Sequence, residues 1–259
     1  MPGGPKPMER ARRLELAHEI AASIQHYYGD RVLAIGLYGS LARGTDGPYS
    51  DIEMHCVLRG SGAFPWLEWS AGDWKAEVDV FSEEGILARA SEVDIDWALA
   101  QRACTAVVAL YDPTGFFARL RQTALAHPDH VFQQAIRDVI VGEIYERIGK
   151  IRNARTEQHG ACLPYLAIEL AKEGAYLLGL ANRCLYTTST RLFEESLALP
   201  GLADGYAALC QMVMKGELGD MDQIADAADA FWSGIETWAQ ERDIRIEDQL
   251  ETLLKGSAQ

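Results

Sequence analysis

The spacing of apolar residues changes near residue 127 of this 259-residue chain. Before that point, short apolar or alternating runs predict strands over 32–38, 51–58, 66–69, 74–81 and 103–111. Helical spacing in the same half predicts helices over 8–28, 82–90, 94–102 and 114–126. The first half is therefore expected to combine helices with a sheet.

Strand patterns disappear after His127-Pro128, and apolar residues recur at helical spacing instead. Gly and Pro separate the predicted helices 128–154, 162–183, 189–199, 202–214, 221–241 and 246–254. The sequence predicts an α+β chain with an α/β domain over 1–126 and a helical bundle over 127–259.

The most informative stretch, LAIGLYGSLARGTDGPYSDIEMHCV, runs from Leu33 to Val57. Asp51 and Glu53 are one residue apart in a predicted strand, so both face the same way. Two neighbouring carboxylates repel unless a cation lies between them, and Mg²⁺ commonly binds one or two carboxylates together with phosphate oxygens. This pair is the candidate metal site; the alternative is a turn with two solvated acids.

The Gly39-Ser40 corner precedes these acids and is the candidate phosphate site. Glycine permits close backbone approach to a phosphate, and Ser40 with the following amides can donate hydrogen bonds. Arg43 can neutralise phosphate charge. Ser50, at the end of the turn-rich segment, is a further candidate for nucleotide binding.

The strand 74–81 places Lys75, Glu77 and Asp79 on one face. That face can meet Asp51 and Glu53, or it can be an ordinary solvated face. The tryptophans fit core positions, although Trp66, Trp69 and Trp74 can instead wall a sugar-binding cleft; His55 is expected to pack.

In the second half, Glu146 and Lys150 are four residues apart on one helical face, with Glu143 one turn earlier. Spacing alone favours a surface salt bridge.

The formal net charge of −14 argues against a nucleic-acid-binding protein and suits a small polycationic substrate, although it also serves solubility. The five cysteines form no C-x-x-C pair, so reduced thiols in a cytoplasm are expected rather than disulfides or zinc. The sequence has no apolar run that predicts a signal peptide or a membrane span.

A Gly-Ser corner followed by acid-apolar-acid resembles the nucleotidyltransferase superfamily that includes DNA polymerase β. The resemblance extends further, to the kanamycin nucleotidyltransferase (aminoglycoside 4′-O-nucleotidyltransferase) family. It is carried by 34–57, DWKAEVDVF, EIYERIGKIRNAR and CLYTTST, in the same order from about His18 to Trp238. It implies a polymerase β-like domain with a mixed sheet, followed by a helical-bundle domain.

The resemblance also implies an activity: transfer of AMP from Mg-ATP to the 4′-hydroxyl of kanamycin-like aminoglycosides. Glu146 is the implied general base, Lys150 a phosphate contact, and Glu77 the implied third acid, with Asp79 as its rival. The residues implied for aminoglycoside binding are Lys75, Glu77, Glu143 and Glu146. A homodimer that shares its active sites between subunits is implied too. The alternatives are a nucleotidyltransferase acting on a protein and a non-catalytic interaction protein.

Overall fold

The computed structural model describes residues 3–62, 64–156 and 160–250. The chain divides into two compact units. The N-terminal unit comprises Met1–Glu92 and Ala100–His127, and the C-terminal unit comprises Val93–Leu99 and Pro128–Gln259. The short segment Val93–Leu99 therefore belongs with the later helices, whereas the domain boundary predicted at residue 126 stays a prediction.

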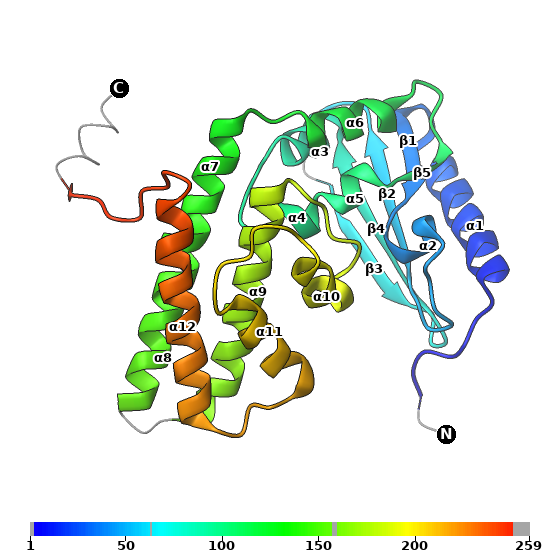
Figure 1. Ribbon diagram of the computed structural model, residues 1–259. Helices are drawn as coiled ribbons and strands as arrows, with labels where there is room; N and C mark the ends of the chain where they lie inside the picture. Colours follow the sequence, from blue (N-terminus) through cyan, green and yellow to red (C-terminus); the bar gives the residue numbers. More distant parts are fainter. Residues whose placement is uncertain (1–2, 63, 157–159, 251–259) are drawn as a thin grey trace. The chain divides into compact units, whose positions relative to one another are not determined.

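The N-terminal unit is built on a five-stranded mixed sheet in the order β3-β4-β2-β1-β5 (Figure 1). The strands are β1 (Val32–Leu37), β2 (Ile52–Leu58), β3 (Trp66–Ser70), β4 (Lys75–Ser82) and β5 (Val108–Tyr111). Strands β2 and β4 pair in parallel, and the other neighbouring pairs of the described sheet are antiparallel. The expected α+β architecture with a mixed sheet is confirmed.

Two hydrophobic clusters fix the helices of this unit to the sheet. Its helices are α1 (Arg10–Tyr28), α2 (Gly39–Arg43), α3 (Glu83–Ala90), α5 (Arg102–Thr105) and α6 (Phe116–Leu125), with a 3₁₀ turn at Gly29–Arg31. Apolar residues of α1 pack on one sheet face, against Ile52, Met54 and Val78. Residues of α3 and α6 pack against Val57 on the opposite face. Polar side chains occupy the remainder of that second face.

The prediction of one buried strand over 103–111 is wrong. Residues Arg102–Thr105 form α5, and only Val108–Tyr111 form a strand. This strand is at the sheet edge, where Val108 is 47% exposed, so its apolar run reflects β propensity rather than burial. The predicted helix 94–102 is also interrupted: α4 (Trp97–Ala100) and α5 are separated at Gln101, whose side-chain amide donates to two carbonyls, those of Arg89 and Glu92.

The C-terminal unit consists of helices packed around α9 (Leu163–Asn182), which buries residues on most of its sides (Figure 1). The other helices of this unit are α4, α7 (Asp129–Asp138), α8 (Tyr145–Thr156), α10 (Leu192–Leu197), α11 (Tyr206–Lys215) and α12 (Met221–Gln240). Short 3₁₀ turns lie at Gly160–Cys162 and Ser189–Arg191.

The helix predicted over 128–154 contains a π-helical segment, Val139–Ile144, between α7 and α8. Such segments change the register of the faces on either side. The helix predicted over 246–254 is not formed at 246–249, and 251–254 lie outside the described residues.

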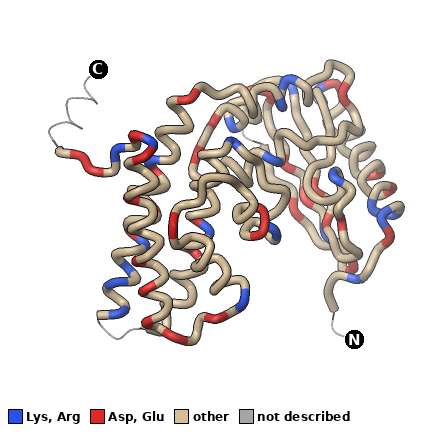
Figure 2. Tube along the Cα trace, in the orientation of Figure 1, with Lys and Arg blue, Asp and Glu red and all other residues tan. Residues whose placement is uncertain are grey.

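Acidic residues are distributed over both units (red in Figure 2). The five cysteines all lie within the described residues, and none of them is in a disulfide. In the part of the chain that the structure describes, none of the helices has both the length and the apolar character that crossing a membrane requires.

Candidate active site

Strand register gathers acids from three strands on the second face of the sheet. Glu53 on β2 lies opposite Glu77 on β4, which lies opposite Glu68 on β3. Asp79 lies one step along the same face, and Asp51 immediately precedes β2. These five residues, Asp51, Glu53, Glu68, Glu77 and Asp79, are called the acidic face below. The structure thus brings the predicted acids together and adds Glu68, which sequence spacing did not single out.

The corner at Gly39 is shaped by Glu53. Gly39 has φ +68°, and a Cβ built on it would lie 1.6 Å from Oε2 of Glu53. The Tyr38 amide donates to the Glu53 carbonyl at 3.0 Å, and the Ser40 amide donates to the Glu53 carboxylate. The close approach that requires glycine in this structure is the one to Glu53. The predicted approach of a phosphate to the same corner stays a prediction.

Glu53 carries negative charge that its surroundings leave poorly compensated. Burial, followed by the charges of Asp51 and Glu77, raises the pKa of Glu53 to about 7. The Ser40 amide and the Arg43 charge act in the opposite direction but are weaker. A cation between Asp51 and Glu53 would relieve this repulsion, which is the behaviour expected of a metal-binding carboxylate pair.

Lys75 lies among the carboxylates without reaching Glu53. Its Nζ is 2.6 Å from Glu68, 3.8 Å from Asp51 and 3.9 Å from Glu77. The Glu68 hydrogen bond is the main reason that the pKa of Lys75 is raised. Lys75 therefore stays charged and neutralises part of the acidic face at its β3 side.

Tyr38 links the acids of β4, although no pattern in the sequence singles it out. Its hydroxyl is 2.7 Å from Oε1 of Glu77 and 3.2 Å from Oδ2 of Asp79. Its ring stacks on buried His55 at 4.1 Å. His55 Nε2 lies 3.1 Å from the Ala103 carbonyl, and burial is the main cause that lowers the pKa of His55 to about 4. His55 packs as expected.

The turn between α2 and β2 is anchored by a buried ion pair. Asp46, with a side chain 1% exposed, binds Arg13 at 2.6 Å and also pairs with Arg10. The Ser50 hydroxyl accepts the Gly47 amide at 3.0 Å, which closes the turn immediately before Asp51. Through this hydrogen bond, Ser50 stabilises the loop that leads to Asp51 and Glu53.

In the C-terminal unit, Glu146 and Lys150 form the expected i,i+4 pair on α8, with Oε1 and Nζ 2.5 Å apart. Both side chains are at least half exposed, and the hydrogen bond from Lys150 is the main cause that lowers the pKa of Glu146. Glu143 lies one turn earlier, in the π segment. Arg147, which lies between Glu146 and Lys150 in the chain, binds buried Glu173 on α9 at 2.5 Å.

The residues present fit a divalent cation that is completed by phosphate oxygens. Among the described residues, no three His, Cys, Asp or Glu side chains are grouped closely enough to hold a metal by themselves. Asp51 and Glu53 supply the one or two carboxylates that Mg²⁺ ordinarily takes alongside phosphates. The raised pKa of Glu53 is the structural sign that a positive charge is favoured there.

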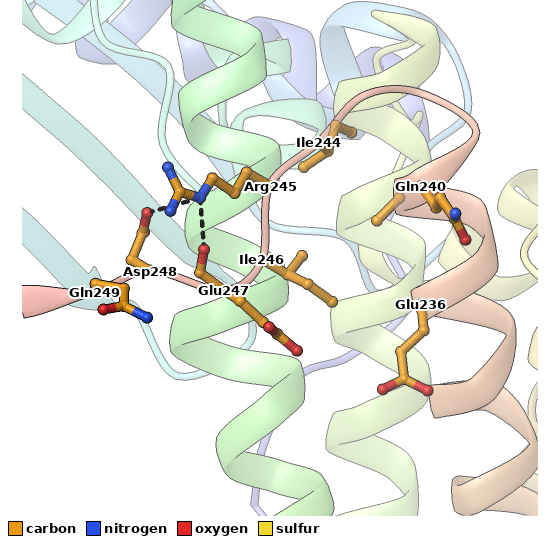
Figure 3. A pocket seen from close by; sticks show the side chains of 9 residues that line it. Glu236, Gln240, Ile244, Arg245, Ile246, Glu247, Asp248 and Gln249 are labelled. Atoms are coloured by element: carbon orange, nitrogen blue, oxygen red, sulfur yellow. Dashed lines mark hydrogen bonds and ion pairs between the residues drawn. The ribbon is translucent and has the colours of Figure 1, made fainter. Parts of the chain in front are cut away.

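A separate hollow of about 630 Å³ lies in the C-terminal unit (Figure 3). The end of α12 and the segment after it form its wall, including Glu236, Gln240, Arg245 and Asp248. None of the predicted site residues lines this hollow.

The fold has a solved counterpart. A nucleotidyltransferase-like protein from Exiguobacterium sibiricum 255-15 superposes with a TM-score of 0.52 over 87% of this chain and 75% of its own, at 12% identity. At that identity the likeness concerns the fold alone. The chain therefore has the fold of a nucleotidyltransferase-like protein.

Sequence relatives specify the family. The KNTase C-terminal domain family matches residues 114–245. Two proteins called aminoglycoside nucleotidyltransferase (4′), from Staphylococcus aureus and from a Bacillus species, are each 42% identical over 237 residues, covering 92% of this chain and 94% of the relative. The chain belongs to the aminoglycoside 4′-nucleotidyltransferase family, and the predicted resemblance is confirmed.

Proposed function

We propose that this protein transfers AMP from Mg-ATP to the 4′-hydroxyl of a kanamycin-like aminoglycoside and releases pyrophosphate, which makes it a resistance enzyme. The observation that carries the proposal is the acidic face, which is built around a glycine corner. It lies in a chain that is 42% identical to a protein called aminoglycoside nucleotidyltransferase (4′). The five acids also suit a polycationic substrate, because they attract ammonium groups.

Asp51 and Glu53 are the residues that would hold the metal. When bound, Mg²⁺ neutralises triphosphate charge and favours attack at the α-phosphorus. The corner beside these carboxylates is formed by Gly39, Ser40 and Arg43. The turn that follows it is closed by Ser50. Ser40 and Arg43 bind the phosphates, while Gly39 and Ser50 keep the backbone in the required shape.

Glu146 is proposed as the general base that accepts the proton of the attacking hydroxyl. Its pKa is lowered by Lys150, so it is ionised at neutral pH and able to accept a proton. When Lys150 turns to the phosphates, Glu146 loses the partner that lowers its pKa and becomes a stronger base. Phosphate binding and base activation are coupled in this way.

The aminoglycoside is held through its ammonium groups. Glu77, supported by Tyr38, and Glu143 on the π segment are the proposed partners of these groups. Lys75 orients Glu68 and Glu77.

The decisive experiment measures magnesium-dependent pyrophosphate release from ATP with and without kanamycin. Wild type is compared with Glu146→Gln and with Glu217→Gln, a matched change of an exposed acid in the same unit. Pyrophosphate release that needs both the drug and Glu146 supports the proposed aminoglycoside nucleotidyltransferase activity and the role of Glu146 as general base. Drug-dependent release that survives Glu146→Gln keeps the enzyme and rejects this base. If folded protein binds ATP but no aminoglycoside elicits release, the proposed function is wrong.

We further propose a homodimer in which Glu146 and Lys150 of one subunit complete the site formed by the acids of the other. Family resemblance is the support for this arrangement. Asp51→Asn and Glu146→Gln proteins, each inactive alone, should regain activity when mixed under conditions of subunit exchange. If mixing restores nothing although mixed dimers form, each site is completed within one subunit.

A further inference from the structure

Beside the acids that the family resemblance singled out, β3 and β4 enclose a small hollow. Its volume is about 260 Å³, and its lining includes Phe64, Trp66, Asp79, Phe81 and Ser82. Trp66 lies directly opposite Asp79 in the strand register, so both side chains belong to the face that carries Glu77 and Glu68. Pockets for drug-sized ligands span roughly 300–1,000 Å³, so this hollow is the size of a subsite for one ring.

The carboxylate of Asp79 has unused acceptor capacity. Tyr38 has one hydroxyl proton, and its shorter contact, 2.7 Å against 3.2 Å, is the one to Glu77. Asp79 also lies 3.6 Å from His55 Nδ1, and the charge of Arg89 acts on it without an ion-pair contact. Among the described residues, Asp79 has no Lys or Arg within ion-pair distance, unlike Glu68, Glu77 and Asp51, which share Lys75.

Trp66 adds an aromatic surface beside that carboxylate. Trp66 is 63% exposed on the edge strand β3, so its indole is open to solvent. An indole face attracts cations and packs against the apolar face of a sugar ring. A carboxylate with spare acceptor capacity next to an exposed indole matches the chemistry of an amino sugar, which has an ammonium group on a ring with one apolar face.

We propose that Trp66 and Asp79 form a subsite for one ammonium-bearing ring of the aminoglycoside, with Trp66 beneath the ring and Asp79 accepting from its ammonium. The proposal rests on the proposed function for the identity of the substrate. It assigns Asp79 a task separate from that of Glu77: Tyr38 holds Glu77, and Asp79 remains available to the drug.

The test measures kanamycin binding by calorimetry and KM for kanamycin and for ATP in Asp79→Asn, Trp66→Ala and Trp66→Phe proteins. Asp79→Asn is expected to weaken kanamycin binding about tenfold, the loss of one charge-assisted hydrogen bond, with the KM for ATP within about twofold. Trp66→Ala should weaken kanamycin binding comparably, and Trp66→Phe should restore most of it. The matched controls are Asp73→Asn, in an exposed turn, and Tyr27→Ala, 80% exposed on α1; neither should change binding.

A set of kanamycin derivatives, each with one ammonium replaced by hydroxyl, identifies the group. One derivative should bind equally well to wild type and to Asp79→Asn, because it lacks the ammonium group that Asp79 contacts. The same derivative should still bind less tightly to Trp66→Ala than to wild type. Unchanged kanamycin binding in folded Asp79→Asn and Trp66→Ala proteins would overturn the subsite. Because calorimetry needs no turnover, absence of AMP transfer by the wild type counts against the proposed function and leaves this test intact.

Discussion

Glu53 on β2 and Glu146 on α8 are both acids that spacing singled out, yet their surroundings act on them in opposite directions. Glu53 is packed against the Gly39 corner, and burial with neighbouring acids raises its pKa to about 7. Glu146 is exposed, and the hydrogen bond and charge of Lys150 lower its pKa. In the sheet, the carboxylate of Glu53 is half-buried and repelled by neighbouring acids. On the helix, the carboxylate of Glu146 forms an exposed ion pair with Lys150 that separates easily.

The difference shows how each acid suits its proposed task. A carboxylate held in repulsion gains most from a cation, which fits metal binding. A carboxylate paired with a movable lysine gains basicity when that lysine leaves, which fits proton transfer. Two glutamates thus suit different tasks, metal binding and proton transfer, because their environments differ.

The largest effect is expected for the buried pair that fixes α8 to α9. Glu173→Gln leaves Arg147 without its charged partner in a position that is 14% exposed. We expect a loss of about 3–5 kcal/mol in the free energy of unfolding, measured by urea denaturation, because the buried charge is then uncompensated. The control is Glu169→Gln, on the same helix, whose pair with Lys172 is more exposed and should matter less. Equal losses in the two proteins would contradict this account.

The second prediction concerns the corner that shapes the acidic face. Gly39→Ala inserts a Cβ where the Glu53 carboxylate lies and forces a strained φ. A displacement of about 1 Å at a reacting centre costs roughly 100-fold, so we expect drug-dependent pyrophosphate release to fall by at least that factor. Gly47→Ala, in the turn just after the corner, meets nothing within 4 Å and should retain activity. Wild-type rates in Gly39→Ala would show that Glu53 can be moved without harm.

The third prediction tests repulsion at Glu53 through pH. A carboxyl whose folded pKa is raised from 4.5 to about 7 destabilises the fold by an amount that grows as pH rises between these values. In protein freed of metal with EDTA, Glu53→Gln should therefore stabilise the fold at pH 8 by on the order of 2 kcal/mol and much less at pH 5. Thermal unfolding at both pH values measures it. A stabilisation that is the same at pH 5 and pH 8 would exclude charge as its cause.

The smallest effect on stability is expected at Glu146. Its side chain is 62% exposed, and its pair with Lys150 is a surface pair. Glu146→Gln and Lys150→Met should leave the midpoint of thermal unfolding unchanged while drug-dependent transfer falls. A clear drop in the unfolding midpoint would mean that this pair is structural, and the contrast with Glu53 would weaken.

Much of the fold was predictable from local patterns. The paired strands on either side of the Gly39 corner, the Ser82 cap of α3 and the long helices α1, α9 and α12 lie within a few residues of their predicted positions. Predictions failed where burial or pairing partners decide, as at 103–111, where an apolar run became a short helix and an exposed edge strand. The π segment within 128–154 has no signal in apolar spacing.

The sequence alone determined the alternation that puts Asp51 and Glu53 on one face, the spacing that pairs Glu146 with Lys150, and the family. The first two depend on residues close in the chain, whose geometry follows from strand and helix periods. The family depends on motifs that recur in the same order along the chain. Only the tertiary structure decided that Glu68 joins the acidic face with Trp66 beside it, and that the Tyr38 hydroxyl lies against Glu77 and Asp79. It also decided that position 39 needs glycine, because the Glu53 carboxylate occupies the space of a side chain there. Those contacts depend on which strands become neighbours and in what register, and local spacing carries no information about that choice.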